Sequence, residues 1–461
     1  MNIAIIGGGP GGYVAAIRAA QLGANVTLIE KDTLGGTCLN RGCIPTKALL
    51  HTAELLTEAK DGARFGVIAK PKLDFSKTAE YKNATVKKLV SGVESLMRAN
   101  KIEVICGEAS FSGAKTLTVK KADGEGISIS PDKVIIATGS EPAMPPIPGI
   151  ETPCCIDSTG ALSLETVPAR LAIIGGGVIG VEMATAFAAF GSEVTIIEMM
   201  DEILPMMDAE LVSILRGKLE GSGINIITGA KVLAVSGDEN SGRVTYELAG
   251  KEGFVDAERI LVSTGRKIST DSLNLAAAGI ANERSRILVN EKQETNASGI
   301  YAIGDCTGGS MLAHIASVQG EVAAENAAGH QASYDTKTNP SCVYTNPELA
   351  GVGLTECEAI RRGIAINIGR FPLAANGKTQ IVGSDGIIKI ISGSKYGEIL
   401  GVHILGPRAT DLISAASIMI GLEATLDEVA GTIFAHPTVG EAIREAALAA
   451  WERPIHIAQN K

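Results

Sequence analysis

The chain has 461 residues, of which 45% are hydrophobic, 3% aromatic and 20% charged, and its formal net charge at pH 7 is −10. The length allows about three domains, and an acidic chain without a basic patch excludes nucleic acid as the main partner. Eight cysteines are too few for a disulfide scaffold in a chain of this length, so we expect mostly reduced thiols and a cytoplasmic location.

The sequence shows no sign of export or membrane insertion. It begins MNIAIIGGG, without the charged leader and cleavable apolar core of a secretory signal. The apolar run over 171–191 carries glycines near its start and Glu182 in its middle. These features favour a strand, a turn and a helix over a membrane span, and we expect no membrane contact.

A dinucleotide-binding fingerprint opens the chain. A strand is predicted over 2–6, an alanine-rich helix follows to about residue 22, and a second strand ends at Glu30. Between the first strand and the helix lies a GxGxxG pattern made by Gly7, Gly9 and Gly12. Such glycines make the turn, let a pyrophosphate approach the backbone and allow the helix to pack on the strand. The helix N-terminus stabilises the phosphate charge, and the acid accepts hydrogen bonds from a ribose.

The same pattern returns near the middle of the chain. Its glycines are Gly175, Gly177 and Gly180. Glu198 follows the last of them by 18 residues, the spacing that also separates Gly12 from Glu30. Two matching fingerprints predict two dinucleotide sites, one per domain. An acid at this place bonds the 2′-hydroxyl of NAD and repels the 2′-phosphate of NADP, and no arginine follows closely, so we expect NAD at the second site.

Two cysteines between the fingerprints form a candidate redox pair. Cys38 and Cys43 lie in the stretch GGTCLNRGCIPTK, before a helix expected to open near Pro45. The positive end of that helix and the charges of Arg41 and Lys47 favour thiolate over thiol. The alternatives are a structural disulfide or half of a zinc site, although zinc pairs usually have tighter spacing and need a second pair. We predict a redox-active dithiol and no metal.

Later strand ends carry further candidate binding residues. A buried strand ends in Thr138 and Gly139, and a strand of the second domain runs into Gly265 in the same way. Another strand stops at Asp305, and a helix rich in small residues follows over 311–328. An acid in this place binds a ligand hydroxyl, and the helix start stabilises negative charge. Simple capping of the helix by the aspartate is the alternative.

The last part of the chain has no nucleotide fingerprint and is predicted to be α+β. Its marked feature is the segment AHPTVGE, in which His436 precedes Glu441 by five residues at a helix start. A histidine with an orienting carboxylate suits a general base. A structural histidine beside a helix N-terminus is the alternative.

These patterns predict an α/β protein in four segments. We expect a first dinucleotide-binding segment over 1–145, a second dinucleotide-binding domain over 146–266, a segment over 267–336 that completes the first domain, and a C-terminal α+β domain over 337–461. Both dinucleotide domains should be Rossmann-like. Two dinucleotide sites beside a dithiol predict one electron path, in which a flavin couples nicotinamide to the thiols.

Together the motifs resemble the pyridine nucleotide-disulfide oxidoreductases. The resemblance rests on GGTCLNRGCIPTK, the two fingerprints, GGGVIGVE, AIGDCTGGSMLAH and HPTVGE, and it covers essentially the whole chain. It implies FAD in the first domain, NAD in the second, and a homodimer formed through the C-terminal domain. Within the family, it implies oxidation of dihydrolipoamide carried by a lipoyl-bearing protein of a 2-oxo acid dehydrogenase or glycine cleavage complex.

The resemblance also implies a division of labour in the thiol chemistry. Cys38 exchanges with the substrate sulfur, while Cys43 lies against the flavin as the charge-transfer thiolate. His436, held by Glu441, serves the dithiol of the partner chain.

The implied cofactor contacts lie along the whole chain. Lys47 pairs with Glu182 near the reactive edge of the flavin. The other implied contacts with FAD and NAD are the six fingerprint glycines, Glu30, Thr138, Gly139, Asp305, Met311, Ala313, Glu198 and Gly265. The sequence departs from the usual family pattern at Gly440, where a serine is common, and at Ile315, where a polar residue is common.

Two alternatives remain open. One is another disulfide reductase on the same scaffold, acting on glutathione, trypanothione or mercuric ion; the missing arginines after Glu198 argue against its NADPH-dependent members, and this chain ends PIHIAQNK rather than in paired cysteines. The other is a structural flavoprotein subunit whose dithiol is only a stabilising disulfide. The adjacent Cys154 and Cys155 are interpreted as ordinary small residues.

Overall fold

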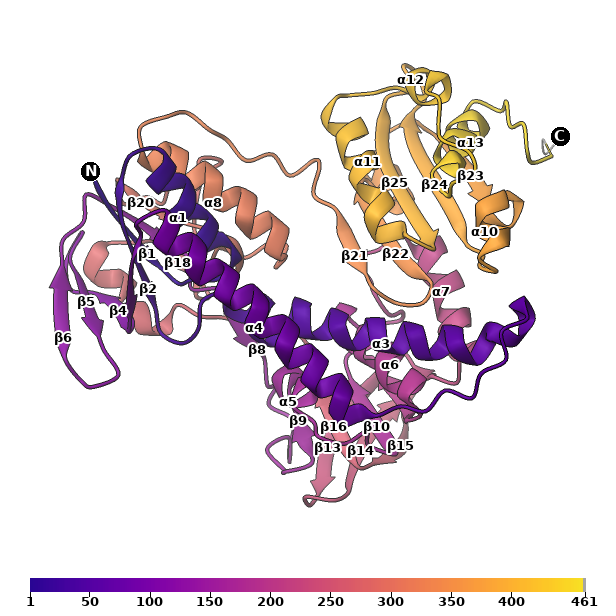
Figure 1. The fold of residues 1–461 in the computed structure, drawn as a ribbon, viewed down its shortest axis with the longest axis horizontal. Helices are drawn as coiled ribbons and strands as arrows, with labels where there is room; N and C mark the ends of the chain where they lie inside the picture. The colour runs from indigo at the N-terminus through magenta and orange to yellow at the C-terminus, as the bar shows by residue number, and fades with distance from the viewer. Residues whose placement is uncertain (459–461) are drawn as a thin grey trace.

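The computed structural model describes residues 1–458 and has three lobes (Figure 1). The first combines the indigo N-terminal strands with orange segments from around residue 300, the second lies below it, and the yellow C-terminal part forms the third. None of the helices in the described residues has the length and apolar character that crossing a bilayer requires.

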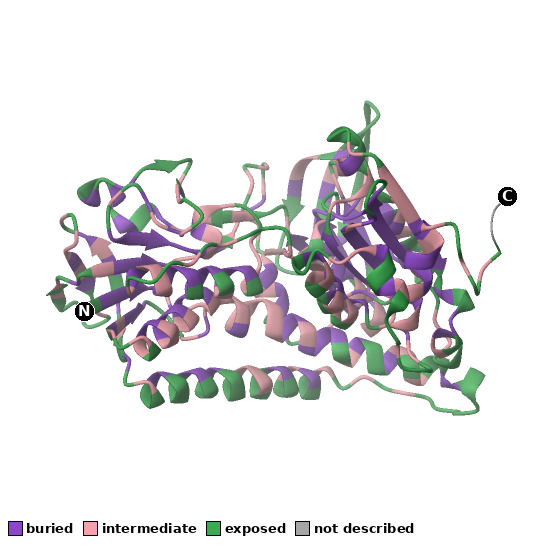
Figure 2. Ribbon diagram, turned by 90° about the horizontal axis from the view of Figure 1, so that it is seen from above, coloured by how far each residue is buried: buried purple, intermediate pink, exposed green. Residues whose placement is uncertain are grey.

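The first lobe is built on a parallel sheet in the strand order β20-β7-β1-β2-β3. The strands are β1 (Asn2–Ile6), β2 (Asn25–Glu30), β3 (Glu103–Cys106), β7 (Lys133–Ile136) and β20 (Ile300–Ala302). Helices α1 (Pro10–Gln21) and α8 (Ala313–Ala327) cover one face, and the antiparallel strands β4 (Glu108–Phe111), β5 (Leu117–Lys120) and β6 (Gly126–Ile129) cover the other. With both faces covered, strands β1, β2, β7 and β20 are largely apolar and buried, whereas the edge strand β3 is mostly exposed (Figure 2).

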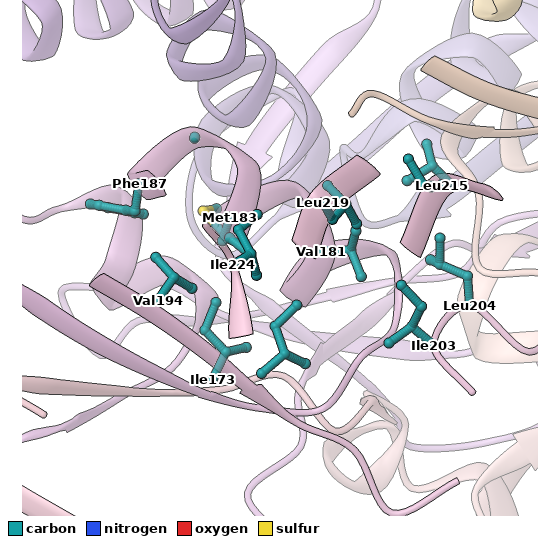
Figure 3. Close-up of a cluster of buried hydrophobic side chains, with 14 of the residues drawn as sticks. Ile173, Val181, Met183, Phe187, Val194, Ile203, Leu204, Leu215, Leu219 and Ile224 are labelled. Atoms are coloured by element: carbon teal, nitrogen blue, oxygen red, sulfur yellow. The ribbon is translucent and has the colours of Figure 1, made fainter. Parts of the chain in front are cut away.

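The second lobe repeats this plan. Its parallel sheet has the order β12-β11-β10-β16-β9, with β9 (Cys155–Ile156), β10 (Arg170–Ile174), β11 (Glu193–Ile197), β12 (Asn225–Ile227) and β16 (Arg259–Val262). Helices α6 (Val178–Phe190) and α7 (Ala209–Gly221) pack on one face, where Figure 3 shows Ile173 and Val194 of the strands among Phe187, Leu215 and Leu219. The other face carries the antiparallel strands β13 (Ala230–Gly237), β14 (Gly242–Leu248) and β15 (Lys251–Ala257).

The chain passes twice between these lobes, and the two passes lie side by side. Strand β8 (Ser140–Pro142) leaves the first lobe, β17 (Arg266–Ile268) returns from the second, and the two pair antiparallel. Strand β20 then pairs with β7. A short helix α5 (Ser158–Leu162) and the hairpin β18 (Asn282–Glu283) and β19 (Arg286–Ile287) complete these regions.

Three helices follow the first fingerprint: α2 (Gly36–Arg41), α3 (Cys43–Asp61) and α4 (Phe75–Ala99). The side chain of Asp74 caps α4 by accepting a hydrogen bond from the backbone N–H of Lys77 at 3.2 Å. Val90, Val93 and Met97 recur at helical spacing and form the buried stripe of α4. Helix α3 instead packs its apolar residues against the second lobe and so joins the first two lobes.

The third lobe is an antiparallel sheet in the order β21-β22-β25-β24-β23. Its strands are β21 (Ser341–Val343), β22 (Glu348–Gly353), β23 (Ile366–Pro372), β24 (Ile387–Gly393) and β25 (Ile399–Gly406), and its helices are α9 (Glu356–Arg361), α10 (Gly377–Ile381), α11 (Ala409–Gly421), α12 (Leu426–Gly431) and α13 (Glu441–Ala450). The predicted α/β class, with two Rossmann-like parallel sheets and a C-terminal α+β domain, is confirmed.

A buried ion cluster holds the third lobe against the second. Lys389 of β24 is 1% exposed, and its Nζ lies 3.0 Å from Asp208, 2.8 Å from Glu210 and 2.7 Å from Glu356. Arg370 of β23 adds a second cation, 2.8 Å from Glu210. Removing one partner of such a cluster would leave a buried charge without a counter-charge, which is energetically costly. The cluster therefore fixes how the second and third lobes pack against each other.

Candidate functional site

One cavity of about 1780 Å³ runs through the contact region of the three lobes. Its walls include both glycine turns, both cysteines of the dithiol, and residues that follow the carboxyl ends of the parallel strands. Ligands of open parallel sheets bind at these strand ends. A cavity of this volume exceeds the roughly 300–1,000 Å³ of an ordinary small-molecule pocket and suits two dinucleotides.

The first fingerprint has the geometry that phosphate binding requires. Gly7 has φ +104°, and a Cβ on Gly12 would lie 1.8 Å from the Gly7 carbonyl oxygen, so neither position accepts a side chain. A Cβ on Gly9 would instead find its nearest neighbour at 3.9 Å. The backbone at Gly9 therefore faces the cavity at the start of α1, as the approach of a pyrophosphate demands.

The second fingerprint repeats this arrangement. Gly175 has φ +110°, and a Cβ on Gly180 would lie 2.1 Å from the Gly175 oxygen, whereas one on Gly177 would meet nothing within 4 Å. The two acids also match. Glu30 accepts a hydrogen bond of 2.6 Å from the Gly8 N–H, and Glu198 accepts one of the same length from Gly176. In each case the carboxylate is pinned across its own glycine turn and lines the cavity.

The dithiol lies between the two fingerprints. Cys38 belongs to α2, Cys43 is the first residue of α3, and both are free thiols in this structure. We expected the helix to open near Pro45, but it begins two residues earlier, so Cys43 itself lies at the helix N-terminus. Gly42, with φ −145° and ψ −111°, separates the two helices, and both thiols line the cavity.

The two thiols have different protonation chemistry. The hydrogen bond from Cys38 and the nearby charge of Lys47 outweigh burial and lower the pKa of Cys43 to about 7. The same hydrogen bond, together with burial, raises the pKa of Cys38. Of the pair, Cys43 is therefore the one that holds the negative charge.

Lys47 stands one helical turn beyond Cys43 and pairs with the second lobe. Its Nζ lies 2.9 Å and 2.7 Å from the two carboxylate oxygens of Glu182 on α6, whose side chain is only 3% exposed. Tyr344, after β21 of the third lobe, donates its backbone N–H to Glu182 at 3.0 Å, and its ring lies 4.5 Å from Lys47 Nζ. All three lobes thus meet at this ion pair.

Asp305 sits at the crossing between the lobes. Its carboxylate accepts a hydrogen bond from Ser140 Oγ, and Arg266 Nε donates to the same hydroxyl at 2.7 Å and lies 3.8 Å from Asp305. The remaining predicted binding residues also line the cavity: Thr138, Gly139, Gly265, Met311 and Ala313. Ile315, one of the two departures, is buried in α8.

His436 and Glu441 lie elsewhere. His436 Nδ1 is 2.9 Å from Glu441 Oε1, and the Thr438 N–H also donates to Glu441 at 2.9 Å. Burial would raise the pKa of Glu441, but these hydrogen bonds and the histidine charge lower it. Gly440 leaves these hydrogen bonds intact at the start of α13. The histidine side chain is 79% exposed, and neither residue belongs to the cavity wall, so one chain does not bring this pair to its own dithiol.

Several residues of the cavity wall were not predicted from the sequence. Tyr344 and Cys342 come from β21 and its following turn, where no motif marked them. Burial raises the pKa of Cys342 to about 11. Ser140 and Arg266 follow the two matching Thr-Gly pairs, so the repeated ATG and STG strand ends were the available signal for them. Among the described residues, no group of acidic, cysteine and histidine side chains is arranged to hold a metal ion.

The residues present fit two bound dinucleotides. Gly9 and Gly177 leave open the places where a pyrophosphate approaches, and each turn has a helix N-terminus behind it. Glu30, Asp305 and Lys47 would hold FAD in the first domain, and Glu198 would hold NAD in the second.

Comparison with known proteins places this geometry in a family. The sequence profile of the pyridine nucleotide-disulphide oxidoreductases matches residues 1–320, and the profile of that family's dimerisation domain matches 339–447. Dihydrolipoyl dehydrogenase of Bacillus subtilis is 44% identical, over 99% of this chain and 99% of its own. The mitochondrial dihydrolipoyl dehydrogenase of Pisum sativum is 41% identical, over 99% of this chain and 92% of its own.

Solved structures agree with this assignment. LpdA from Mycobacterium tuberculosis superposes with a TM-score of 0.90 at 26% identity, covering 97% of this chain and 99% of its own. The HOCl-induced flavoprotein disulfide reductase RclA from Escherichia coli has a TM-score of 0.86 at 32% identity, with the same coverage. With the family profiles matched on either side of the third-lobe boundary, and with full-length relatives above 40% identity, the chain belongs to the pyridine nucleotide-disulphide oxidoreductases.

Proposed function

We propose that this chain oxidises protein-bound dihydrolipoamide to lipoamide and reduces NAD⁺ to NADH. The observation that carries the proposal is the single cavity that joins two dinucleotide turns to a dithiol with one acidic thiol. The full-length relatives named dihydrolipoyl dehydrogenase support the choice of substrate. Bound FAD would supply the two-electron transfer between the thiols and the nicotinamide.

Thiol exchange is the part that this chain's own residues perform. In the oxidised enzyme Cys38 and Cys43 form a disulfide. A thiolate of dihydrolipoamide attacks the Cys38 sulfur, the disulfide bond breaks, and Cys43 leaves as the thiolate. The second substrate sulfur then attacks the mixed disulfide and displaces Cys38, so lipoamide leaves oxidised and the enzyme dithiol is reduced. The low pKa of Cys43 makes it the better leaving group in the first step.

His436 takes the proton that the substrate thiol loses. Its Nδ1 is held by Glu441, which leaves Nε2 free to accept the proton and lets the carboxylate stabilise the imidazolium. The exposure of His436 and the matched dimerisation domain support an active site that combines both subunits of a homodimer. The partner beyond the dimer is a lipoyl-bearing protein, and eight free cysteines fit a cytoplasmic location.

Replacing Cys38 by serine tests the function most directly. In Cys38→Ser, dihydrolipoamide oxidation should fall by at least about 10³-fold, because no sulfur is left to accept the substrate. NADH oxidation with an artificial acceptor should persist, since that reaction bypasses the dithiol. The matched control is Cys106→Ser, an exposed cysteine outside the cavity, which should change neither rate. The measurement is NAD-linked dihydrolipoamide oxidation beside NADPH-linked reduction of glutathione disulfide. Lipoamide turnover that survives in Cys38→Ser, or faster turnover of glutathione disulfide, would refute the proposal.

The charge on Cys43 should be visible in the absorbance of the two-electron-reduced, FAD-loaded enzyme. A thiolate beside the flavin gives a long-wavelength charge-transfer band. Because the pKa of Cys43 is lowered to about 7, the band should be strong above pH 7 and should fade as acid protonates the thiolate. Cys43→Ser should lack the band at every pH. A midpoint near 9.0, the ordinary thiol value, would show that neither Cys38 nor Lys47 acts on this group.

The choice of nucleotide should depend on Glu198. Glu198→Arg replaces the acid with a partner for a 2′-phosphate, so the ratio of kcat/KM for NADP⁺ over NAD⁺ should rise by at least about tenfold. The substitution also removes the acceptor of the Gly176 N–H, so Glu198→Gln, which keeps an acceptor, is the control for damage to the turn. Glu198→Gln should weaken NAD⁺ without improving NADP⁺. An unchanged ratio of kcat/KM for NADP⁺ over NAD⁺ in Glu198→Arg would show that residue 198 does not contact the 2′ position of the bound nucleotide.

Mixing two inactive variants tests whether the site is shared between subunits. Dimers of Cys38→Ser and dimers of His436→Gln should each be inactive in lipoamide turnover. After the subunits are exchanged in equal amounts, half of the dimers are hybrids, and each hybrid has one site with an intact dithiol and an intact histidine. Activity should therefore recover to about a quarter of the wild type. If each dithiol used the histidine of its own chain, mixing would restore nothing.

A further inference from the structure

A second cavity of about 610 Å³ lies beside the site but outside it. Its walls include residues of α2, α3 and α4 from the first domain and of α5 from the second. Four residues belong to the walls of both cavities: Arg41, Thr159, Leu162 and Ser163. Neither fingerprint contributes to the second cavity, and the chemistry derived above does not use it.

The central feature of this cavity is a buried lysine without a counter-ion. Lys82 on α4 is 8% exposed, and its Nζ donates a hydrogen bond to the carbonyl oxygen of Leu162 at the end of α5. Within the described residues, no carboxylate lies at ion-pair distance from this ammonium group. Burial lowers the pKa of Lys82. Buried charges in proteins are nearly always paired, and a single carbonyl uses one of the three N–H donors of an ammonium group.

The other lining residues strengthen the positive character. Lys87, five residues further along α4, is exposed at the cavity wall, and Arg41 of α2 is a third cation of the wall, although it also pairs with Asp32. Glu94 is the only carboxylate among the described residues of the wall. Hydroxyl and amide side chains fill much of the remainder: Thr33, Asn40, Asn83, Ser91, Thr159 and Ser163. Cations from two helices, together with these hydroxyl and amide groups, suit a ligand with several acceptor oxygens and more than one negative charge.

We propose that this cavity is a binding site for a small phosphate-bearing anion, with Lys82 as its central ligand. The volume lies within the roughly 300–1,000 Å³ of small-molecule sites, so the phosphate group can carry an organic part. The anion supplies the missing counter-charge of Lys82. Since the walls belong to two domains, its binding ties α5 of the second domain to α4 of the first, next to the helix that carries Cys38.

The test uses the full-length, FAD-loaded enzyme in saturating NAD⁺, so that both nucleotide sites are filled. Inorganic phosphate is titrated at constant ionic strength. Its affinity is measured by isothermal titration calorimetry, and its effect on Tm by differential scanning calorimetry. Binding should be saturable and should raise Tm. In Lys82→Met the affinity should fall at least about tenfold, because a buried charge-assisted hydrogen bond is lost. In Lys87→Gln it should fall about threefold, as for an exposed charge. Lys88→Gln, an exposed neighbour on α4 outside the wall, is the matched control and should bind as the wild type does.

Each opposite result overturns the proposal. An equal rise in Tm with sodium chloride would show ionic screening instead of a site. Phosphate binding that disappears when NAD⁺ is added would belong to the nucleotide turns. Unchanged phosphate affinity in Lys82→Met would show that Lys82 does not bind the anion. If that variant does not fold, unchanged phosphate affinity in Lys87→Gln would overturn the proposal instead.

Discussion

The ion pair between Lys47 and Glu182 is the contact on which the site depends. Lys47 extends from the dithiol helix α3, Glu182 lies buried on α6 of the second domain, and Tyr344 adds a backbone hydrogen bond and an aromatic ring from the third lobe. Leaving Glu182 without its cation would cost roughly 3–5 kcal/mol, as for other buried pairs broken on one side. The contact therefore holds three lobes together at the place where the thiols face the cavity.

The two domains meet the cavity in equivalent ways. In both, the first glycine of the turn packs against the end of a neighbouring strand, and a carboxylate accepts a hydrogen bond from the N–H of the residue after that glycine. The middle glycine of the pattern has no close neighbour on its Cβ side. In a parallel sheet the carboxyl ends of all strands lie on one side. Residues at these ends in both sheets line the same cavity. The crossing strands β8 and β17 and the residues around Asp305 keep these edges in place. One pocket lined by two equivalent glycine turns thus results from repeating one fold.

The protonation chemistry is divided between places that one chain keeps apart. Cys43 takes the negative charge because Cys38 donates to it and Lys47 lies close, whereas Cys38 stays protonated. The proposed base, His436 held by Glu441, lies in the turn before α13 and is exposed to solvent. In the proposed reaction the thiols and the base would meet only across a dimer, and the matched dimerisation-domain profile supports a homodimer.

The sequence by itself determined the parts whose chemistry is local. Strand, glycine turn, helix and acid follow one another within about 30 residues of a βαβ unit, so both fingerprints, the dithiol and the His436–Glu441 pair were predicted at their residues. The tertiary structure decided what lies between distant segments. Tyr344 and Cys342 reach the cavity only through strand pairing and lobe packing, and neither the ion cluster at Lys389 nor the lack of a counter-ion at Lys82 has a local sequence signal. The physical reason is that burial and charge pairing depend on which surfaces pack together, and this packing cannot be predicted from a local pattern of residues.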